Sequence, residues 1–120
     1  MTSVYIVDDS DLLLERVIAL ITENPNLKYA GHSSAYEGTA ASIKSAQPDV
    51  VILDIRLGDG SGIDLLKELK LQPDCPKIIM FTNFAIPQYK ERCLEFGADY
   101  FLDKGTGSKV LARTLQNIAG

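Results

Sequence analysis

The sequence predicts an α/β fold in which a parallel β-sheet is covered by helices on both faces. Short apolar runs of strand length alternate with segments whose apolar residues recur at helical spacing, from one end of the chain to the other. One run, 50–53, consists of four consecutive apolar residues, which is typical of a strand buried on both faces. It leads directly into Asp54 and a glycine-rich loop, and α/β proteins carry out their chemistry beyond such strand ends.

Composition predicts one globular domain, 1–120. The 120 residues are 46% hydrophobic and 23% charged, with a formal charge of −4 and no run of Lys and Arg that could form a nucleic-acid groove. The longest apolar segment, 12–21, is short and interrupted by charges, so we expect no membrane span and no secretory signal. Cys75 and Cys93 lack metal-ligand spacing and are expected to be reduced thiols of a cytoplasmic protein.

Five strands and five helices are expected to alternate along the chain. The apolar runs that predict strands are 4–7, 27–31, 50–53, 77–81 and 100–102. Apolar residues at helical spacing predict helices over 11–23, between Ser34 and Pro48, and over 63–70, 87–96 and 108–119. No repeat, low-complexity tract or linker interrupts these five units.

Local signals mark the ends of the first two helices. The segment 24–26, Asn-Pro-Asn, ends the first helix. Ser34 and Glu37 fit a capping box that would open the second, and Pro48 closes it. The second helix carries small residues that predict close packing on the sheet, namely Ala40, Ala41 and Ala46. His32, the only histidine, has no nucleophile beside it in the sequence and is expected to be structural.

The second half of the chain has equally clear signals. The loop 72–76 contains two prolines and separates the third helix from the fourth strand. Pro87 suits the first turn of the fourth helix, where a missing N–H is tolerated. Gly97 suits a left-handed cap after that helix.

Five residues with chemically useful side chains are expected at the ends of four strands. Asp8 and Asp9 follow the first strand, Asp54 the third, Thr82 the fourth and Lys104 the fifth. Because the carboxyl ends of parallel strands open onto one edge of the sheet, these side chains are expected to meet there. Three carboxylates in one crevice need a cation or an ammonium group among them, and Mg²⁺ suits oxygen ligands.

This set of residues predicts phosphoryl transfer to a carboxylate. Asp54 would be the nucleophile, while a metal ion and Lys104 neutralise phosphoryl oxygens and Thr82 donates a hydrogen bond. Each residue alone has a plain structural explanation: Asp9 or Ser10 could cap a helix, Thr82 could be a strand former, and Lys104 could be a solvated charge. Their joint occurrence at four strand ends favours the chemical interpretation.

With these residues in place, the chain resembles the response-regulator receiver domains of the CheY-like superfamily over essentially 3–119. The acidic pair matches Asp8 and Asp9, the phosphoacceptor matches Asp54, the hydroxyl residue matches Thr82, and the lysine matches Lys104. The resemblance implies a flavodoxin-like, doubly wound (βα)5 domain with the strand order 2-1-3-4-5. It implies Mg²⁺ (or Mn²⁺) as the cofactor.

The resemblance also assigns roles to residues near the site. In that family the backbone carbonyl of the residue at Arg56 binds the metal ion, and the aromatic switch residue falls on Phe101. The side chains of Arg56, Asn83 and Phe84 occupy positions expected to tune phosphorylation or dephosphorylation. A glycine, Gly105, follows the lysine where the family has a cis-proline, so a trans bond is the default here.

The function implied is a phosphoacceptor switch in a two-component system rather than an enzyme. A histidine kinase or histidine phosphotransfer protein would donate the phosphoryl group to Asp54. The surface of the fourth helix, fifth strand and fifth helix would then bind a downstream target or effector domain, or form a homodimer. The chain would be a stand-alone receiver or the receiver portion of a longer regulator.

Three alternatives remain open from the sequence. An aspartyl-phosphate hydrolase also uses an Asp at a strand end, although such enzymes generally carry Asp-x-Asp on the first strand. A flavodoxin-like cofactor binder shares the topology, but an acidic mouth would repel a flavin phosphate. A non-phosphorylated interaction module of the same fold would not need the complete set of chemical residues.

Overall fold

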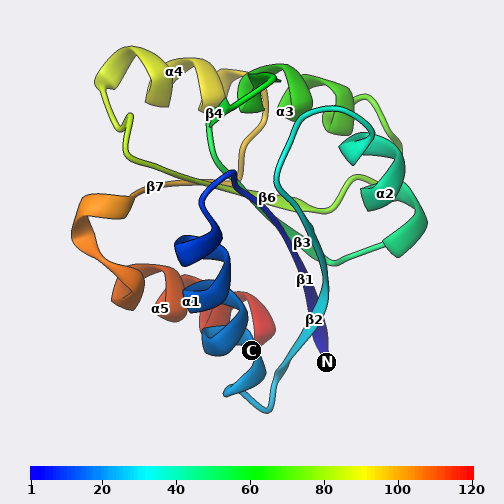
Figure 1. Cartoon of the computed structure of the whole chain (residues 1–120), viewed down its shortest axis with the longest axis vertical. Coiled ribbons are helices and arrows are strands. Elements are labelled where there is room, and N and C mark those ends of the chain that lie inside the picture. The colour runs from blue at the N-terminus through cyan, green and yellow to red at the C-terminus, as the bar shows by residue number, and fades with distance from the viewer.

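A five-stranded parallel sheet forms the centre of the computed structural model, which describes all 120 residues (Figure 1). Its strands are β1 (Thr2–Val7), β2 (Leu27–Ser33), β3 (Val50–Leu53), β6 (Lys77–Thr82) and β7 (Tyr100–Asp103). They lie in the order β2-β1-β3-β6-β7, and every neighbouring pair is parallel. Counted within the sheet alone, this is the predicted order 2-1-3-4-5, so the predicted fold class is confirmed.

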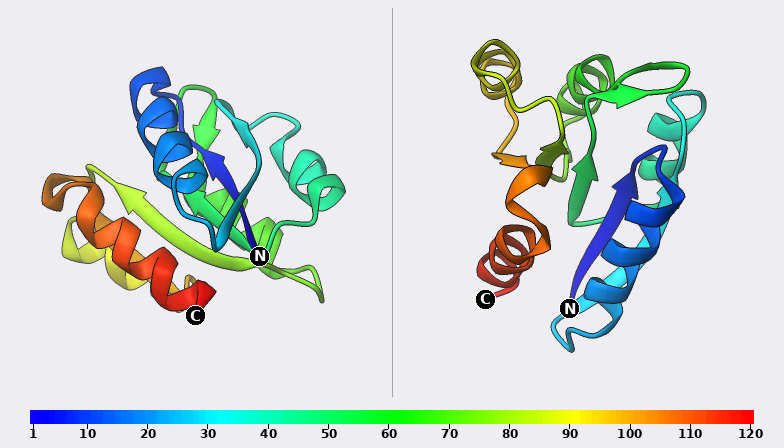
Figure 2. Two further views of the ribbon diagram at one scale, coloured as in Figure 1. Left: turned by 90° about the horizontal axis from the view of Figure 1, so that it is seen from below. Right: turned by 60° about the vertical axis from the view of Figure 1, so that its left-hand side comes forward.

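Five α-helices cover the two faces of the sheet. They are α1 (Asp11–Thr22), α2 (Thr39–Ala46), α3 (Gly62–Lys70), α4 (Pro87–Glu95) and α5 (Ser108–Ala119). Figures 1 and 2 show α1 and α5 on one face and α2, α3 and α4 on the other. None of these helices has the length and apolar character that crossing a membrane requires.

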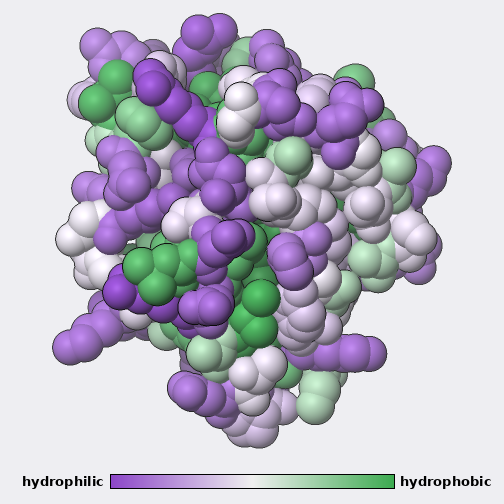
Figure 3. All heavy atoms as spheres, viewed as in Figure 1, coloured by the Kyte–Doolittle hydropathy of each residue, from purple (hydrophilic) through white to green (hydrophobic).

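Each face of the sheet has its own apolar layer, which explains the uninterrupted apolar run of β3. Val51 and Leu53 pack in the layer that includes Leu65 and Leu66 of α3. Val50 and Ile52 belong to the layer that includes residues of α1 and α5. Because successive side chains of a strand point to opposite faces, a strand buried on both sides needs every residue to be apolar. Figure 3 shows apolar side chains reaching the surface over α1 and α5.

Most predicted boundaries agree with the structure to within two residues. The Oγ of Ser10 accepts a hydrogen bond from the Leu13 N–H at 3.3 Å and caps α1. Pro87 occupies the first turn of α4, and Gly97 follows that helix with φ +100°. These are the positions that the sequence signals predicted.

The predicted capping box at Ser34 and Glu37 is wrong. Helix α2 begins at Thr39, and Gly38, with φ +76°, precedes it. The backbone N–H groups of Tyr36 and Glu37 donate instead to the carboxylate of Asp59, a residue far along the chain. A tertiary contact therefore provides the acceptor that the capping box would have supplied, and the chain continues as a loop.

The close packing predicted for the small residues of α2 holds for Ala40, which packs against the apolar layer that includes Leu65 and Leu66, but is wrong for the other two. Ala41 and Ala46 are exposed, and Ile43 is the large apolar residue of this helix that is buried. A cavity of about 520 Å³ lies between α2 and α3, with Ala40 and Ala41 in its wall.

Two short elements have no counterpart in the sequence-based prediction. A two-stranded antiparallel hairpin, β4 (Arg56–Leu57) and β5 (Gly60–Ser61), forms within the glycine-rich loop after Asp54. A 3-10 helix, η1 (Lys104–Thr106), follows β7, and the carboxylate of Asp103 accepts from the Gly105 N–H at 2.7 Å. Both elements carry residues of the predicted site.

Candidate functional site

Three carboxylates meet at the carboxyl edge of the sheet, as the sequence predicts. Carboxylate oxygens of Asp8, Asp9 and Asp54 all lie within 4.8 Å of one another. Asp8 and Asp54 are buried and Asp9 is exposed. The backbone fixes the two buried residues, because the Asp8 N–H donates to Ser33 O and the Asp54 N–H donates to Val7 O, each at 3.1 Å.

Lys104 lies within the carboxylate cluster. Its Nζ is 2.7 Å from Oδ2 of Asp8 and 2.8 Å from Oδ2 of Asp54, and its side chain is only 11% exposed. Helix η1 begins at Lys104 directly after β7 and directs the lysine to this edge. No peptide bond in the chain is cis, so the lysine makes both contacts with a trans bond to Gly105.

Both oxygens of Asp54 have hydrogen-bond donors. Oδ2 accepts from Lys104, and Oδ1 accepts from the Ile55 N–H at 2.7 Å. The Ile55 amide is a contact that the sequence could not reveal, because every residue has a backbone N–H. Oδ1 of Asp8 accepts in the same way from the Ser10 N–H at 2.9 Å.

Burial and ion pairing shift the pKa values of this cluster. Burial raises the pKa of Asp8 above its usual value, although hydrogen bonds from Lys104 and the Ser10 amide partly oppose the shift. Burial alone would lower the pKa of Lys104, but the hydrogen bonds to Asp54 and Asp8 outweigh it and raise that pKa. Lys104 is therefore an ammonium group held between two carboxylates.

Thr82 and Phe101 lie on one face of the sheet. Met80 pairs with Phe101, and Thr82 follows Met80 by two residues, so its side chain points the same way. Thr82 is fully buried, and its Oγ1 accepts a hydrogen bond from the Phe84 N–H at 3.1 Å. Phe101 is half-buried against the apolar layer beneath α3 and α4.

The residues expected to tune the site are partly brought together. The guanidinium carbon of Arg56 lies 4.2 Å from the ring centroid of Phe84, a cation–π contact between the loops that follow β3 and β6. Asn83 is exposed and has no side-chain hydrogen bond. The sequence placed Arg56 and Phe84 near the site but did not predict that they stack.

The donor set fits a hard divalent cation. Three carboxylate oxygens converge, and the exposed side of Asp9 leaves room for waters, which Mg²⁺ usually retains. Arg56, whose backbone carbonyl is expected to join them, begins β4 two residues after Asp54. His32, in contrast, is exposed on β2 and hydrogen-bonds the Tyr29 hydroxyl.

Known sequences resemble this chain throughout its length. The model of the response regulator receiver domain matches residues 4–116. The transcriptional regulatory protein DesR of Bacillus subtilis is 30% identical over 118 residues, which cover 98% of this chain and 58% of that protein. A protein-glutamate methylesterase/protein-glutamine glutaminase of Treponema denticola is 32% identical over 88% of this chain, but only 29% of that protein is covered. The chain thus spans little more than half of the regulator it matches.

Solved structures share the fold. A LuxR-family DNA-binding response regulator from Staphylococcus aureus superimposes with a TM-score of 0.90 at 24% identity, covering 100% of both chains. The CheX–CheY–BeF3–Mg²⁺ complex from Borrelia burgdorferi matches with a TM-score of 0.87 at 25% identity, covering 98% of this chain and 89% of the other.

Proposed function

Because the chain belongs to the response regulator receiver domain family, we propose that it is a phosphorylation switch whose phosphoacceptor is Asp54. Receiver domains of this family act in two-component systems, where they interact with histidine kinases and effectors. The observation that carries the proposal is the double contact of Lys104. Its ammonium group forms ion pairs with both Asp54 and Asp8 at the edge where three carboxylates meet.

The proposed step is an in-line transfer to the Asp54 carboxylate. A carboxylate oxygen of Asp54 attacks phosphorus, and the bond from phosphorus to the donor's imidazole nitrogen breaks, the electron pair leaving with that nitrogen. Lys104 stabilises the transferred group, since its Nζ is already 2.8 Å from an oxygen of Asp54. A bound Mg²⁺ (or Mn²⁺), held by Asp8, Asp9, Asp54 and the Arg56 carbonyl, would supply further positive charge at the phosphoryl oxygens.

The proposed conformational response involves Thr82 and Phe101. A phosphoryl group on Asp54 offers new acceptor oxygens, and the Thr82 hydroxyl can donate to one of them. Movement of Thr82 frees space on the face that it shares with Phe101, which can then turn inward. Phe101 has no hydroxyl, so its position depends on packing alone.

Three residues are proposed to tune phosphorylation and dephosphorylation. Arg56 and Phe84 stack on one another between the loops that follow Asp54 and Thr82. Asn83, exposed beside them, is larger than the Ala or Gly usual at its position and can crowd small phosphodonors.

The surface proposed for partners is formed by α4, β7 and α5. Ile86 and Leu94 leave 47% and 44% of their area exposed at α4, as a docking surface requires. The occupant would be a downstream target, an effector domain or a second copy. We assign the domain to the cytoplasm, where histidine kinases are phosphorylated by ATP. We assign it no enzymatic activity beyond its own phosphorylation and dephosphorylation.

Labelling with acetyl phosphate tests the proposal. With Mg²⁺, the protein should acquire one phosphate that is stable in acid and labile in alkali. Asp54→Asn should abolish the labelling, while Asp64→Asn, an exposed aspartate of α3, should leave it intact. Equal labelling of Asp54→Asn would refute the assignment, and steady turnover of a phosphomonoester would favour an aspartyl-phosphate hydrolase.

A further inference from the structure

The β4–β5 hairpin is held from one side by an aspartate that phosphoryl transfer does not use. Asp59 lies at the turn of the hairpin, and its Oδ1 and Oδ2 accept hydrogen bonds from the N–H groups of Tyr36 at 2.6 Å and Glu37 at 3.0 Å. These two hydrogen bonds lower the pKa of Asp59, since they favour the ionised carboxylate. They tie the hairpin to the loop that follows β2.

Packing reinforces this connection. A Cβ added to Gly60 would lie 2.8 Å from the Cβ of Tyr36, so the hairpin backbone lies directly against this side chain. The Tyr36 hydroxyl in turn donates to Oε1 of Glu68 in α3 at 2.8 Å. The loop that Asp59 binds is therefore itself anchored to a helix.

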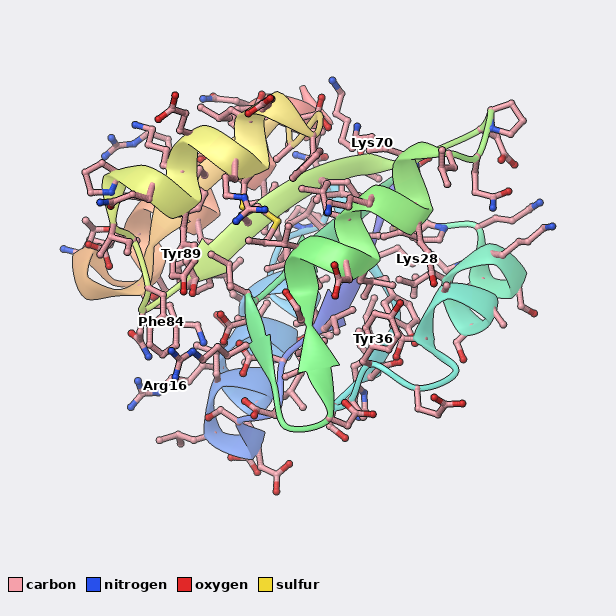
Figure 4. All side chains as sticks on the ribbon, turned by 90° about the horizontal axis from the view of Figure 1, so that it is seen from above. Arg16, Lys28, Tyr36, Lys70, Phe84 and Tyr89 are labelled. Carbon is pink, nitrogen blue, oxygen red and sulfur yellow. The ribbon has the colours of Figure 1, made fainter.

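The opposite side of the hairpin faces Phe84. Figure 4 shows Tyr36 and Phe84 on opposite sides of the hairpin. Arg56, at the start of β4, reaches Phe84 with its guanidinium carbon 4.2 Å from the ring centroid. Because Arg56 follows Asp54 by two residues and Phe84 follows Thr82 by two, the stack bridges the segments that follow these two neighbouring strands.

We infer that Asp59 is a positioning residue that fixes the hairpin so that Arg56 stays stacked on Phe84 across the opening of the Asp54 site. The inference rests on the proposed function of Asp54. Its consequence is slow hydrolysis. In that step a water oxygen attacks phosphorus, the bond from phosphorus to Asp54 breaks, and the carboxylate leaves with the electron pair. The attacking water loses a proton to solvent, and inorganic phosphate is released. A hairpin held closed limits the approach of that water.

The decay rate of the phosphorylated protein tests the inference. After labelling with acetyl phosphate and Mg²⁺ and removal of the donor, Asp59→Ala should lose phosphate at least about threefold faster than the parent. Asp59→Asn keeps one acceptor oxygen, so its rate of phosphate loss should lie between those of the parent and Asp59→Ala. Asp64→Ala removes the same charge from an exposed aspartate of α3 and should decay like the parent.

A double-mutant cycle separates positioning from general loosening of the fold. If Asp59 acts through Arg56, Asp59→Ala should change the decay rate little when Arg56→Ala is already present. The inference would be overturned if the two substitutions multiplied each other's effects on the decay rate. It would also be overturned if Asp59→Ala lost phosphate at the same rate as the parent. A parent that takes up no phosphate on Asp54 would instead refute the proposed function. Should Asp59→Ala not fold by circular dichroism, the same comparisons are made with Asp59→Asn.

Discussion

Replacing Lys104 by methionine should destabilise the fold strongly. Methionine keeps most of the apolar stem but removes the ammonium group, leaving Asp8 and Asp54 close together without their shared partner. Their side chains are only 2% and 7% exposed, so water cannot replace the lost charge. Removing one partner of a buried ion pair costs about 3–5 kcal/mol. We expect the free energy of unfolding at pH 7 to fall by an amount in this range.

The loss should depend on pH with a definite sign. The pKa of Asp8 is already raised by burial, and removing Lys104 removes hydrogen-bonding and coulombic interactions that oppose the shift. A carboxyl with a raised pKa binds more protons folded than unfolded, so its effect on stability becomes unfavourable as pH rises from the unfolded pKa through the folded one. The difference between the variant and the parent should therefore shrink as the pH falls from 7 towards about 4, near the unfolded pKa of Asp.

Urea denaturation at several pH values measures both effects. The urea concentration at the midpoint of unfolding should fall, while the slope of the unfolding free energy against urea concentration should stay unchanged. Lys109→Met removes the same charge from an exposed lysine without an ion pair and should change stability by less than about 0.5 kcal/mol. A Lys104→Met variant as stable as Lys109→Met, or a loss equally large at low and neutral pH, would refute this electrostatic reasoning.

Three further predictions follow from the same geometry. Mg²⁺ at about ten times its dissociation constant should raise the unfolding free energy by about 1.4 kcal/mol, and Asp9→Asn should remove most of this gain, as titration calorimetry can check. Gly62→Ala should cost at least about 3 kcal/mol by urea denaturation, because its Cβ would lie 1.8 Å from the Asp54 carbonyl oxygen. Gly58→Ala, with no contact nearer than 4.0 Å, should be nearly neutral, and equal losses would contradict this account. In thiol labelling of the native protein at pH 8, Cys93 should react far more slowly than Cys75, because Cys93 is fully buried and its pKa is raised to about 11; comparable rates would argue against this packing.

The sequence predicted the sheet and the acidic cluster because both follow from local patterns. Four apolar residues followed by Asp54 identify a buried strand and its end, and parallel strands bring their ends to one edge. The capping box at Ser34 failed because its outcome depends on Asp59, a competitor that lies far away in the sequence. The hairpin after Asp54 was missed because two-residue strands are too short to show a periodicity.

Contacts between loops could not be predicted for a related reason. Nothing in the sequence near Arg56 indicates Phe84, and their stacking depends on where β3 and β6 end relative to each other. The cavity beside α2 is likewise a result of tertiary packing, whereas small residues indicate only that a close approach is possible. Local pattern determines which residues reach the edge of the sheet, and tertiary packing determines which of them touch.

Lys104 explains how three carboxylates can share this edge before any phosphoryl group arrives. Its ammonium group contacts Asp8 and Asp54 at nearly equal distances, so neither buried carboxylate is left without a cation. In the proposed switch, Lys104 can follow Asp54 onto the phosphoryl oxygens without losing Asp8, because an ammonium group has three donors. Asp8 thereby keeps its partner in both states. The remaining donors at this edge must then neutralise the added negative charge. Thr82 is one of them, and it is fully buried on the same face as Phe101. Movement of Thr82 would therefore alter the packing beneath α4.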